Sequence, residues 1–155
     1  MAKKPQYQEH PATSVFPMMS DSEYAEFKED IARNGCREPI VLWKGQLLDG
    51  RNRLRACEEL DKKPPIVSIG DHLDPVAYVM SCNLHRRHLT VSQRSICAAK
   101  LVKLQSNGAP DGARTIDDAA TAFGVGSRTV DRAVEDLEFQ ARPVRPAVEG
   151  LHRGG

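Results

Sequence analysis

The middle of the sequence alternates short apolar runs with turn residues, and this alternation restricts the chain to a fold that mixes strands and helices. Residues 39–43 (PIVLW) are apolar and rich in β-branched side chains, residues 44–45 (KG) supply a turn, and residues 46–48 (QLL) return, which predicts a β-hairpin. The hairpin runs into Gly50, after which residues 51–60 have the composition of a helix. A glycine is therefore expected at the junction between a strand and a helix.

Start and stop signals for other elements lie on both sides of this hairpin. Ser20 precedes Glu23 by three residues, the spacing of a capping box, and residues 34–35 (NG) supply a left-handed stop, so a helix is expected between them. Residues 65–69 are apolar and predict another strand. Residues 74–75 (DP) predict the start of a further helix, because proline is favoured at the first helical position.

The second half of the sequence predicts helices alone. Thr90 and Gln93 form another capping box, which predicts a helix that ends near Leu104. Residues 115–123 and 127–137 have helical periodicity and are separated by a turn that contains glycine. No internal repeat is visible.

These elements predict an α+β fold in two parts. Residues 10–89 are expected to form an N-terminal domain with a small mixed sheet, and residues 90–138 an all-helical part. Residues 1–19 are polar and punctuated by proline, so they predict an extended arm or edge strand. The ends, residues 1–9 and 142–155, are expected to be disordered.

Composition places the chain among folded proteins outside the membrane. Hydrophobic residues make up 40% and charged residues 28% of the 155 residues, and no apolar run approaches the roughly 18 residues that a spanning helix needs. The start (MAKKP) lacks the apolar stretch of a signal peptide, so a cytoplasmic protein is expected. The four cysteines are widely spaced and are expected to be reduced thiols: Cys36, Cys57, Cys82 and Cys97.

The charge is distributed unevenly along the chain. The formal net charge of +1 does not by itself suggest a polyanionic partner. Residues 82–110, however, contain no Asp or Glu. The cations of this stretch are Arg86, Arg87, Arg94, Lys100 and Lys103. Any contact with a nucleic acid is therefore expected to use it.

The glycine junction lies beside several arginines. Gly50 would let the backbone approach an anion, and the first-turn amides of the following helix would favour a phosphate. Arg51, Arg53 and Arg55 follow, and guanidinium groups match phosphate oxygens. Residues 83–88 (NLHRRH) are a second basic element that could close over the same ligand. The alternative is that these arginines merely solvate an exposed helix face.

Three segments together resemble the ParB N-terminal domain, whose fold is also related to sulfiredoxin. Residues 34–41 (NGCREPIV) resemble the family's segment with Gly, Gln and Pro-Ile-Val, and residues 50–56 (GRNRLRA) resemble its phosphate motif. Residues 82–93 resemble its Glu-Asn-x-Gln-Arg motif and the helix that follows. The resemblance covers roughly residues 10–137.

The resemblance implies a nucleotide site and a partner. In the ParB family the pocket binds CTP, and nucleotide binding closes a protein clamp around DNA. By resemblance, this chain would bind a nucleoside triphosphate and double-stranded DNA, as a homodimer. The residues expected at the nucleotide are Gly50, Arg51, Asn52, Arg53, Asn83 and Arg86.

The sequence departs from the family pattern at four positions. Glu38 stands where Gln is usual, and Asn52 stands where the phosphate motif has its first Arg. Arg51 and Cys82 replace the carboxylates of the two motifs. Because Mg²⁺ requires oxygen ligands, we expect no preformed metal site, a weak Mg²⁺ requirement at most, and slow or absent hydrolysis of CTP, with no catalytic residue to assign.

Residues 115–137 have the pattern of a helix-turn-helix. Ala120 permits close contact between helices, Gly124 makes the turn, and Ser127 is expected to cap the second helix. The residues expected to reach base edges or phosphates are Ser127, Arg128, Thr129, Asp131 and Arg132, with Lys100 and Lys103 contacting phosphates. Residues 114–142 hold four Arg and six acidic residues, so a plain helical hairpin is the alternative.

These observations favour a nucleotide-responsive DNA-binding protein of the partitioning or transcription-regulator type. One rival is a ParB-like nuclease or nucleoside triphosphate hydrolase, and another is a simple helix-turn-helix repressor whose N-terminal domain mediates dimerisation. Cys82, His85 and His88 recur at every third residue but lack further ligands for zinc. Cys82 could instead be a reactive thiol. Trp43 is expected to be structural, because its strand holds no second aromatic residue.

Overall fold

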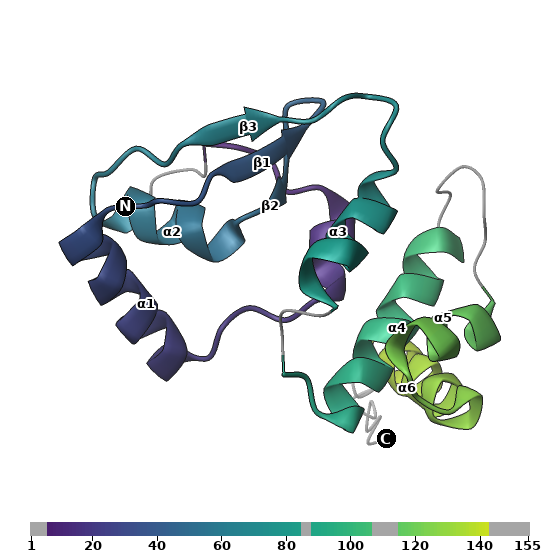
Figure 1. Cartoon of the computed structure of the whole chain (residues 1–155). Coiled ribbons are helices and arrows are strands. Elements are labelled where there is room, and N and C mark those ends of the chain that lie inside the picture. Colours follow the sequence, from purple (N-terminus) through teal and green to yellow (C-terminus); the bar gives the residue numbers. More distant parts are fainter. Residues whose placement is uncertain (1–5, 85–87, 107–114, 143–155) are drawn as a thin grey trace, which may run out of the picture.

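The computed structural model describes residues 6–84, 88–106 and 115–142, and it has the expected α+β architecture (Figure 1). Its sheet has the strand order β2-β1-β3. Strand β1 (Ile40–Trp43) pairs antiparallel with β2 (Gln46–Asp49) and parallel with β3 (Ile66–Ser68). The predicted hairpin and the small mixed sheet are therefore confirmed.

The pairing of the two hairpin strands is irregular near Gly50. Lys44 and Gly45 have φ angles of 48° and 77°, as a tight hairpin turn requires. The pairing register shifts between Val41 and Leu42, opposite the end of β2. Such a bulge turns a side chain away from its regular direction. It lies beside Asp49, the last residue of β2.

Three helices accompany the sheet, and their start signals are those read from the sequence. Helix α1 (Asp21–Asn34) begins with the capping box of Ser20 and Glu23. Helix α2 (Arg51–Glu59) follows Gly50 directly, and α3 (Pro75–Asn83) begins after Asp74, whose carboxylate accepts hydrogen bonds from the amides of Val76 and Ala77. Helices α1 and α2 pack through a separate apolar cluster, which contains Tyr24, Ile31, Ala56 and Cys57.

The second half is helical, as expected. Helix α4 (Val91–Ser106) begins at the predicted box, in which the Gln93 side chain accepts from the Thr90 amide at 2.9 Å. Helix α5 (Ile116–Phe123) ends at Gly124, with φ of 61°, and α6 (Ser127–Gln140) follows. One detail of the prediction is wrong. Ser127 is the first residue of α6 and not its cap, so its hydroxyl donates to Asp117 instead.

The N-terminal segment differs most from its prediction. The His10 amide donates to the Leu47 carbonyl at 2.9 Å and the Leu47 amide donates to the Gln8 carbonyl at 2.8 Å, so residues 8–10 are held against β2. Residues 1–5 and 143–155 lie outside the described residues. After His10 the chain forms the 3-10 helix η1 (Pro11–Val15) instead of an extended arm. Proline at its start and the His10 ring, which accepts from the Ala12 amide, favour this turn.

The largest core cluster joins the sheet to the helices. Ala12, Val15 and Phe16 pack with buried residues of α3, α4, α5 and α6. The Phe16 and Phe123 rings lie 5.8 Å apart between centroids. This core crosses the expected boundary near residue 89, and the division into two domains stays a prediction. In the part of the chain that the structure describes, no helix is both long enough and apolar enough to cross a membrane.

Candidate nucleotide-binding site

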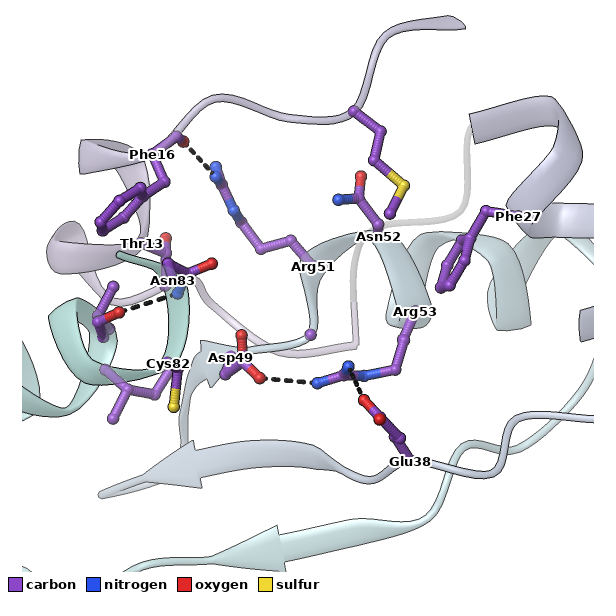
Figure 2. A pocket seen from close by; sticks show the side chains of 14 residues that line it. Thr13, Phe16, Phe27, Glu38, Asp49, Arg51, Asn52, Arg53, Cys82 and Asn83 are labelled. Carbon is purple, nitrogen blue, oxygen red and sulfur yellow. Dashed lines mark hydrogen bonds and ion pairs between the residues drawn. The ribbon is translucent and has the colours of Figure 1, made fainter. Parts of the chain in front are cut away.

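A cavity of about 360 Å³ lies where β2 ends and α2 begins (Figure 2). Its walls come from η1 and the segment after it, α1, the end of β2, the first turn of α2, and the end of α3. The structure brings together five of the six residues expected at a nucleotide: Gly50, Arg51, Asn52, Arg53 and Asn83. The sixth, Arg86, lies outside the described residues, as does His85.

The junction residue Gly50 must be a glycine. Its φ of 98° is one that side chains rarely adopt, and a Cβ there would lie 2.9 Å from Cγ2 of the fully buried Ile40. The same Cβ would lie 3.1 Å from Nε of Arg53. Gly50 is the N-cap of α2, and no side-chain hydrogen bond caps the helix there. The close backbone therefore leaves room for an anion at the helix start.

Arg53 is the central cation of the cavity, and it is already paired. Its Nη1 atom lies 2.8 Å from Oε2 of Glu38, and its Nη2 atom lies 2.7 Å from Oδ2 of Asp49 (Figure 2). The Arg53 and Asp49 side chains are 16% and 20% exposed, whereas Glu38 is 68% exposed. Nε of Arg53 is buried and has no hydrogen-bond partner. A phosphate at Arg53 would have to displace or share these carboxylates.

Arg51 and Asn52 point to a different part of the cavity from Arg53 (Figure 2). Arg51 donates to the carbonyl of Phe16 at 2.6 Å and lies 3.7 Å from Glu9. Asn52 is only 7% exposed, and its Oδ1 is buried without a partner. Because buried polar atoms are nearly always hydrogen-bonded, a group in the cavity that donates a hydrogen bond to Asn52 Oδ1 would be favourable.

The end of α3 closes the opposite wall. Asn83 donates to the carbonyl of Val79 at 2.9 Å, which fixes its amide at the cavity, and Cys82 lies beside it. Thr13 reaches the cavity from η1, with its hydroxyl donating to the His10 carbonyl at 2.8 Å. Thr13 was missed because its segment was predicted to be an arm.

Two carboxylates of the cavity were also missed as site residues. Asp49 could have been found, because it precedes Arg53 by four residues at a strand end. Glu38 was noted only as a departure from the family pattern, and its contact with Arg53 is long-range. With Arg51 and Arg53 they leave the described cavity wall formally neutral.

The residues expected at DNA lie on the α4–α6 part. Arg128, Thr129, Asp131 and Arg132 are exposed on the first two turns of α6, and Ser127 is half-buried against Asp117. Lys100 donates to the Ser14 carbonyl at 3.4 Å, and Lys103 lies 3.8 Å from Glu138.

Lys103 does not lie near the start of α6. Glu138 follows Arg128 by ten residues, which is about 15 Å along a helix, so Lys103 belongs to the other end of α6. Arg94, a cation to which the sequence analysis gave no role, lies nearer to the start of α6, because its Nη1 atom is 3.5 Å from where a Cβ of Gly124 would be. The sequence signal that could have identified Arg94 is its place in residues 82–110, which contain no Asp or Glu.

Two other features considered from the sequence were a metal site and the role of Trp43. Within residues 6–84, 88–106 and 115–142, no three His, Cys, Asp or Glu side chains are grouped as metal ligands. Trp43 is half-buried, with the His10 ring edge-on at 5.3 Å and the Lys44 ammonium 4.5 Å from its centroid. These contacts agree with a structural role for Trp43.

Comparison with known proteins gave matches among solved structures. No family model matches the chain, and no curated protein matches it. It is similar to the C-terminally truncated chromosome-partitioning protein ParB from Caulobacter crescentus complexed with CTP-gamma-S, with 19% identity and a TM-score of 0.45 over 85% of this chain and 74% of that one. It is also similar to the same truncated protein complexed to the centromeric parS site, with 22% identity and a TM-score of 0.42 over 83% and 66%.

Proposed function

We propose that the chain is a ParB-like DNA-binding protein whose cavity at the start of α2 binds a nucleoside triphosphate, CTP by its resemblance to that family. One observation carries the nucleotide part. Asn52 and Arg53 follow a glycine that no other residue can replace without strain, and each has a buried polar atom without a partner in the cavity. A phosphate oxygen at the helix start would accept the missing hydrogen bond from Nε of Arg53, and a donor group elsewhere on the nucleotide would supply the one that Asn52 Oδ1 lacks.

The residues would divide the work of binding. The phosphates would meet the first-turn amides of α2 and the guanidinium of Arg53, and they would displace Glu38 more readily than Asp49, because Glu38 is the more exposed carboxylate. Asn52 and Asn83 would hydrogen-bond polar groups elsewhere on the nucleotide. Arg86 is assigned to the triphosphate by the family resemblance alone.

Hydrolysis is expected to be slow. The family's motif carboxylates are replaced by Arg51 and Cys82, and the carboxylates that do line the cavity, Glu38 and Asp49, are paired with Arg53. No free carboxylate in the described cavity is therefore positioned to hold Mg²⁺ or to activate water. A turnover near 1 per second or faster would contradict this proposal and favour the hydrolase rival.

The DNA part of the proposal is assigned to α5 and α6. The exposed side chains at the start of α6 are of the types that contact base edges, and the turn at Gly124 joins α6 to α5, which begins with a capping box. A homodimer would place two such units on one duplex. We propose partitioning or transcription regulation as the setting, and neither is preferred.

Calorimetric titration with CTP, ATP and GTP, with and without random duplex DNA, tests the nucleotide part. Arg53→Ala should lower CTP affinity roughly tenfold to a hundredfold, since a charge-assisted contact to phosphate is lost. Arg86→Ala should act in the same direction.

Arg55→Ala is the matched control for Arg53→Ala. It removes the same charge from the same helix, but Arg55 lies over the Tyr24 ring at 4.0 Å and bonds Glu59, away from the cavity. If both variants bind CTP equally well, Arg53 is not a phosphate ligand. If the unmodified chain binds no nucleotide at all, the proposed function fails.

A further inference from the structure

Two of the four cysteines, far apart in the sequence, lie together beside the cavity. Cys57 is fully buried on α2, and Cys36 is half-buried in the segment after α1. Both pack in the apolar cluster that contains Tyr24 and Ile31. Cys36 packs against the cluster to which Cys57 belongs, and Cys36 Sγ lies 3.3 Å from the carbonyl oxygen of Glu38.

The thiol pair and the Arg53 ion pair join the same two segments. On α2, Cys57 follows Arg53 by four residues, so both side chains leave the same face of the helix, one turn apart. On the facing segment, Cys36 precedes Glu38 by two residues. The segment is thus held to α2 at two neighbouring points, by the packing of Cys36 against the cluster that contains Cys57 and by the 2.8 Å contact between Glu38 and Arg53.

Cys36 also has a route to small molecules. A second cavity, of about 340 Å³, is lined by Cys36, Arg37 and Asp30, and it shares Phe27, Glu38 and Arg53 with the first cavity. Cys57 does not line either cavity. A reagent that enters this second cavity therefore meets Cys36 first.

We propose that Cys36 and Cys57 form a reversible disulfide, and that this disulfide holds Glu38 against Arg53 and so lowers the affinity of the neighbouring cavity for nucleotide phosphate. The disulfide itself depends only on the packing of the two thiols, whereas its effect on binding rests on the proposed function. Glu38 is the exposed carboxylate that a phosphate would displace, and a covalent link two residues away restricts how far it can move.

The oxidant that the proposal requires is a peroxide. The Cys36 thiolate attacks hydrogen peroxide: an S–O bond forms, the O–O bond breaks, and the departing hydroxide takes a proton to become water. The Cys57 sulfur then attacks the Cys36 sulfur, so the S–S bond forms, the S–O bond breaks, and the hydroxide leaves with the Cys57 proton as a second water. The two sulfurs together lose two electrons, and the peroxide gains them.

The order of these steps follows from burial. Burial raises the pKa of Cys57 to about 11, with a further contribution from its hydrogen bond to Cys36. Cys57 therefore stays protonated near neutral pH and is a poor first nucleophile. Cys36, which lines the second cavity, is the thiol that the peroxide oxidises, and Cys57 is the thiol that resolves it.

The test uses the full chain, reduced or treated with hydrogen peroxide and then desalted. After alkylation of the remaining thiols, proteolysis and mass spectrometry should find a peptide that links Cys36 to Cys57 and that dithiothreitol cleaves. Calorimetry with CTP should show roughly tenfold weaker binding to the oxidised chain, since one charge-assisted contact is obstructed. Cys36→Ser should bind CTP with the same affinity before and after peroxide, and its melting temperature reports whether it folds.

Each result decides a part of the inference. Oxidation of Cys36 without a link to Cys57, or links that involve only the other cysteines, overturns the disulfide. A linked chain that binds CTP as well as the reduced chain overturns the effect on binding. If neither form binds CTP, the proposed function fails and the effect on binding fails with it, while the peptide map still decides whether the disulfide forms.

Discussion

The cavity at α2 and the start of α6 both carry arginines, but the two regions hold them in opposite ways. In the cavity, Arg53 is 16% exposed and bonded to two carboxylates, beside polar atoms that lack partners. On α6, Arg128 and Arg132 are exposed on a helix that also carries acidic residues. A ligand of the cavity must compete with internal carboxylates, whereas a ligand of α6 meets solvated groups.

Because of this difference, the cavity and the α6 surface would contribute to ligand recognition in different ways. The cavity can select its ligand by geometry, because its glycine, arginine and asparagine are fixed by packing and by hydrogen bonds. If α6 binds DNA as we propose, it can contribute specificity through single side chains, but residues 114–142 hold four Arg and six acidic residues, so general attraction to DNA would have to come from elsewhere. The two regions nevertheless share one core, through Phe16 and Phe123.

The largest expected effect would break that shared core. Phe123→Ala removes a ring that is 2% exposed and should lower the free energy of unfolding by about 3–5 kcal/mol. Because the Phe123 ring packs against the Phe16 ring, we expect the whole chain to unfold in one transition. Urea denaturation followed by circular dichroism measures both quantities.

Phe139→Ala is the control for this prediction. Phe139 is 73% exposed, so its loss should change the free energy of unfolding by no more than about 0.5 kcal/mol. Two separate transitions in Phe123→Ala, with CTP still bound after the first, would show that the cavity and the helices fold independently. The comparison would then be between two domains.

The second largest effect is expected at Gly50, which lines the cavity. Gly50→Ala should cost about 2–3 kcal/mol of folding free energy, because the strain of a positive φ adds to contacts with Ile40 and Arg53. Gly45→Ala has a similar strain, at φ of 77°, but its Cβ meets nothing within 4 Å. It should cost about 1 kcal/mol. Equal losses in the two variants, measured by denaturation, would refute the close approach at Gly50.

The same contrast explains how much the sequence could predict. The helix starts at Ser20 and Thr90 and the hairpin turn depend on residues a few positions apart, and all were predicted correctly. The helix η1 was not predicted, because its local signals, Pro11 and the His10 cap, are joined by the burial of Ala12 and Val15 against helices that are distant in the sequence. Local rules capture local hydrogen bonds but not the packing that selects among them.

At the cavity, the motif grouped residues that do lie together, but it did not predict their contacts. Gly50, Asn52 and Arg53 were predicted to share a site, and they line one cavity. That Arg53 is bonded to Glu38 depends on how the segment after α1 returns to α2, for which the sequence offers no local signal. The displacement of Ser127 from its predicted capping position depends likewise on Asp117, in a different helix.

A third effect sharpens the comparison on the α6 side. Arg128→Ala should weaken binding to a preferred duplex by about 1–3 kcal/mol and relax discrimination at one base position, if this exposed side chain reads a base edge. Arg142→Ala, which removes the same charge beyond the end of α6, should leave discrimination unchanged. Titrations against preferred and scrambled duplexes measure the difference. If Arg128→Ala loses no discrimination, α5 and α6 serve as packing elements.

The smallest effect concerns Lys103, where a protein contact and a DNA contact compete for the same ammonium group. Its 3.8 Å approach to Glu138 is partly exposed and should contribute less than about 1 kcal/mol to stability, so Lys103 remains available to a phosphate. If it binds one, Lys103→Ala should weaken all duplexes alike and flatten the dependence of log affinity on log salt by about one unit. Lys100→Ala should act in the same way, and Lys63→Ala, at an exposed position near the sheet, should leave the slope unchanged.

Because Lys103 lies toward the far end of α6 from Arg128, an unchanged slope in Lys103→Ala would confine DNA to the start of α6. The cation next to that end is Arg94, beside Gly124, and a flatter slope in Arg94→Ala would then assign the phosphate contact to it.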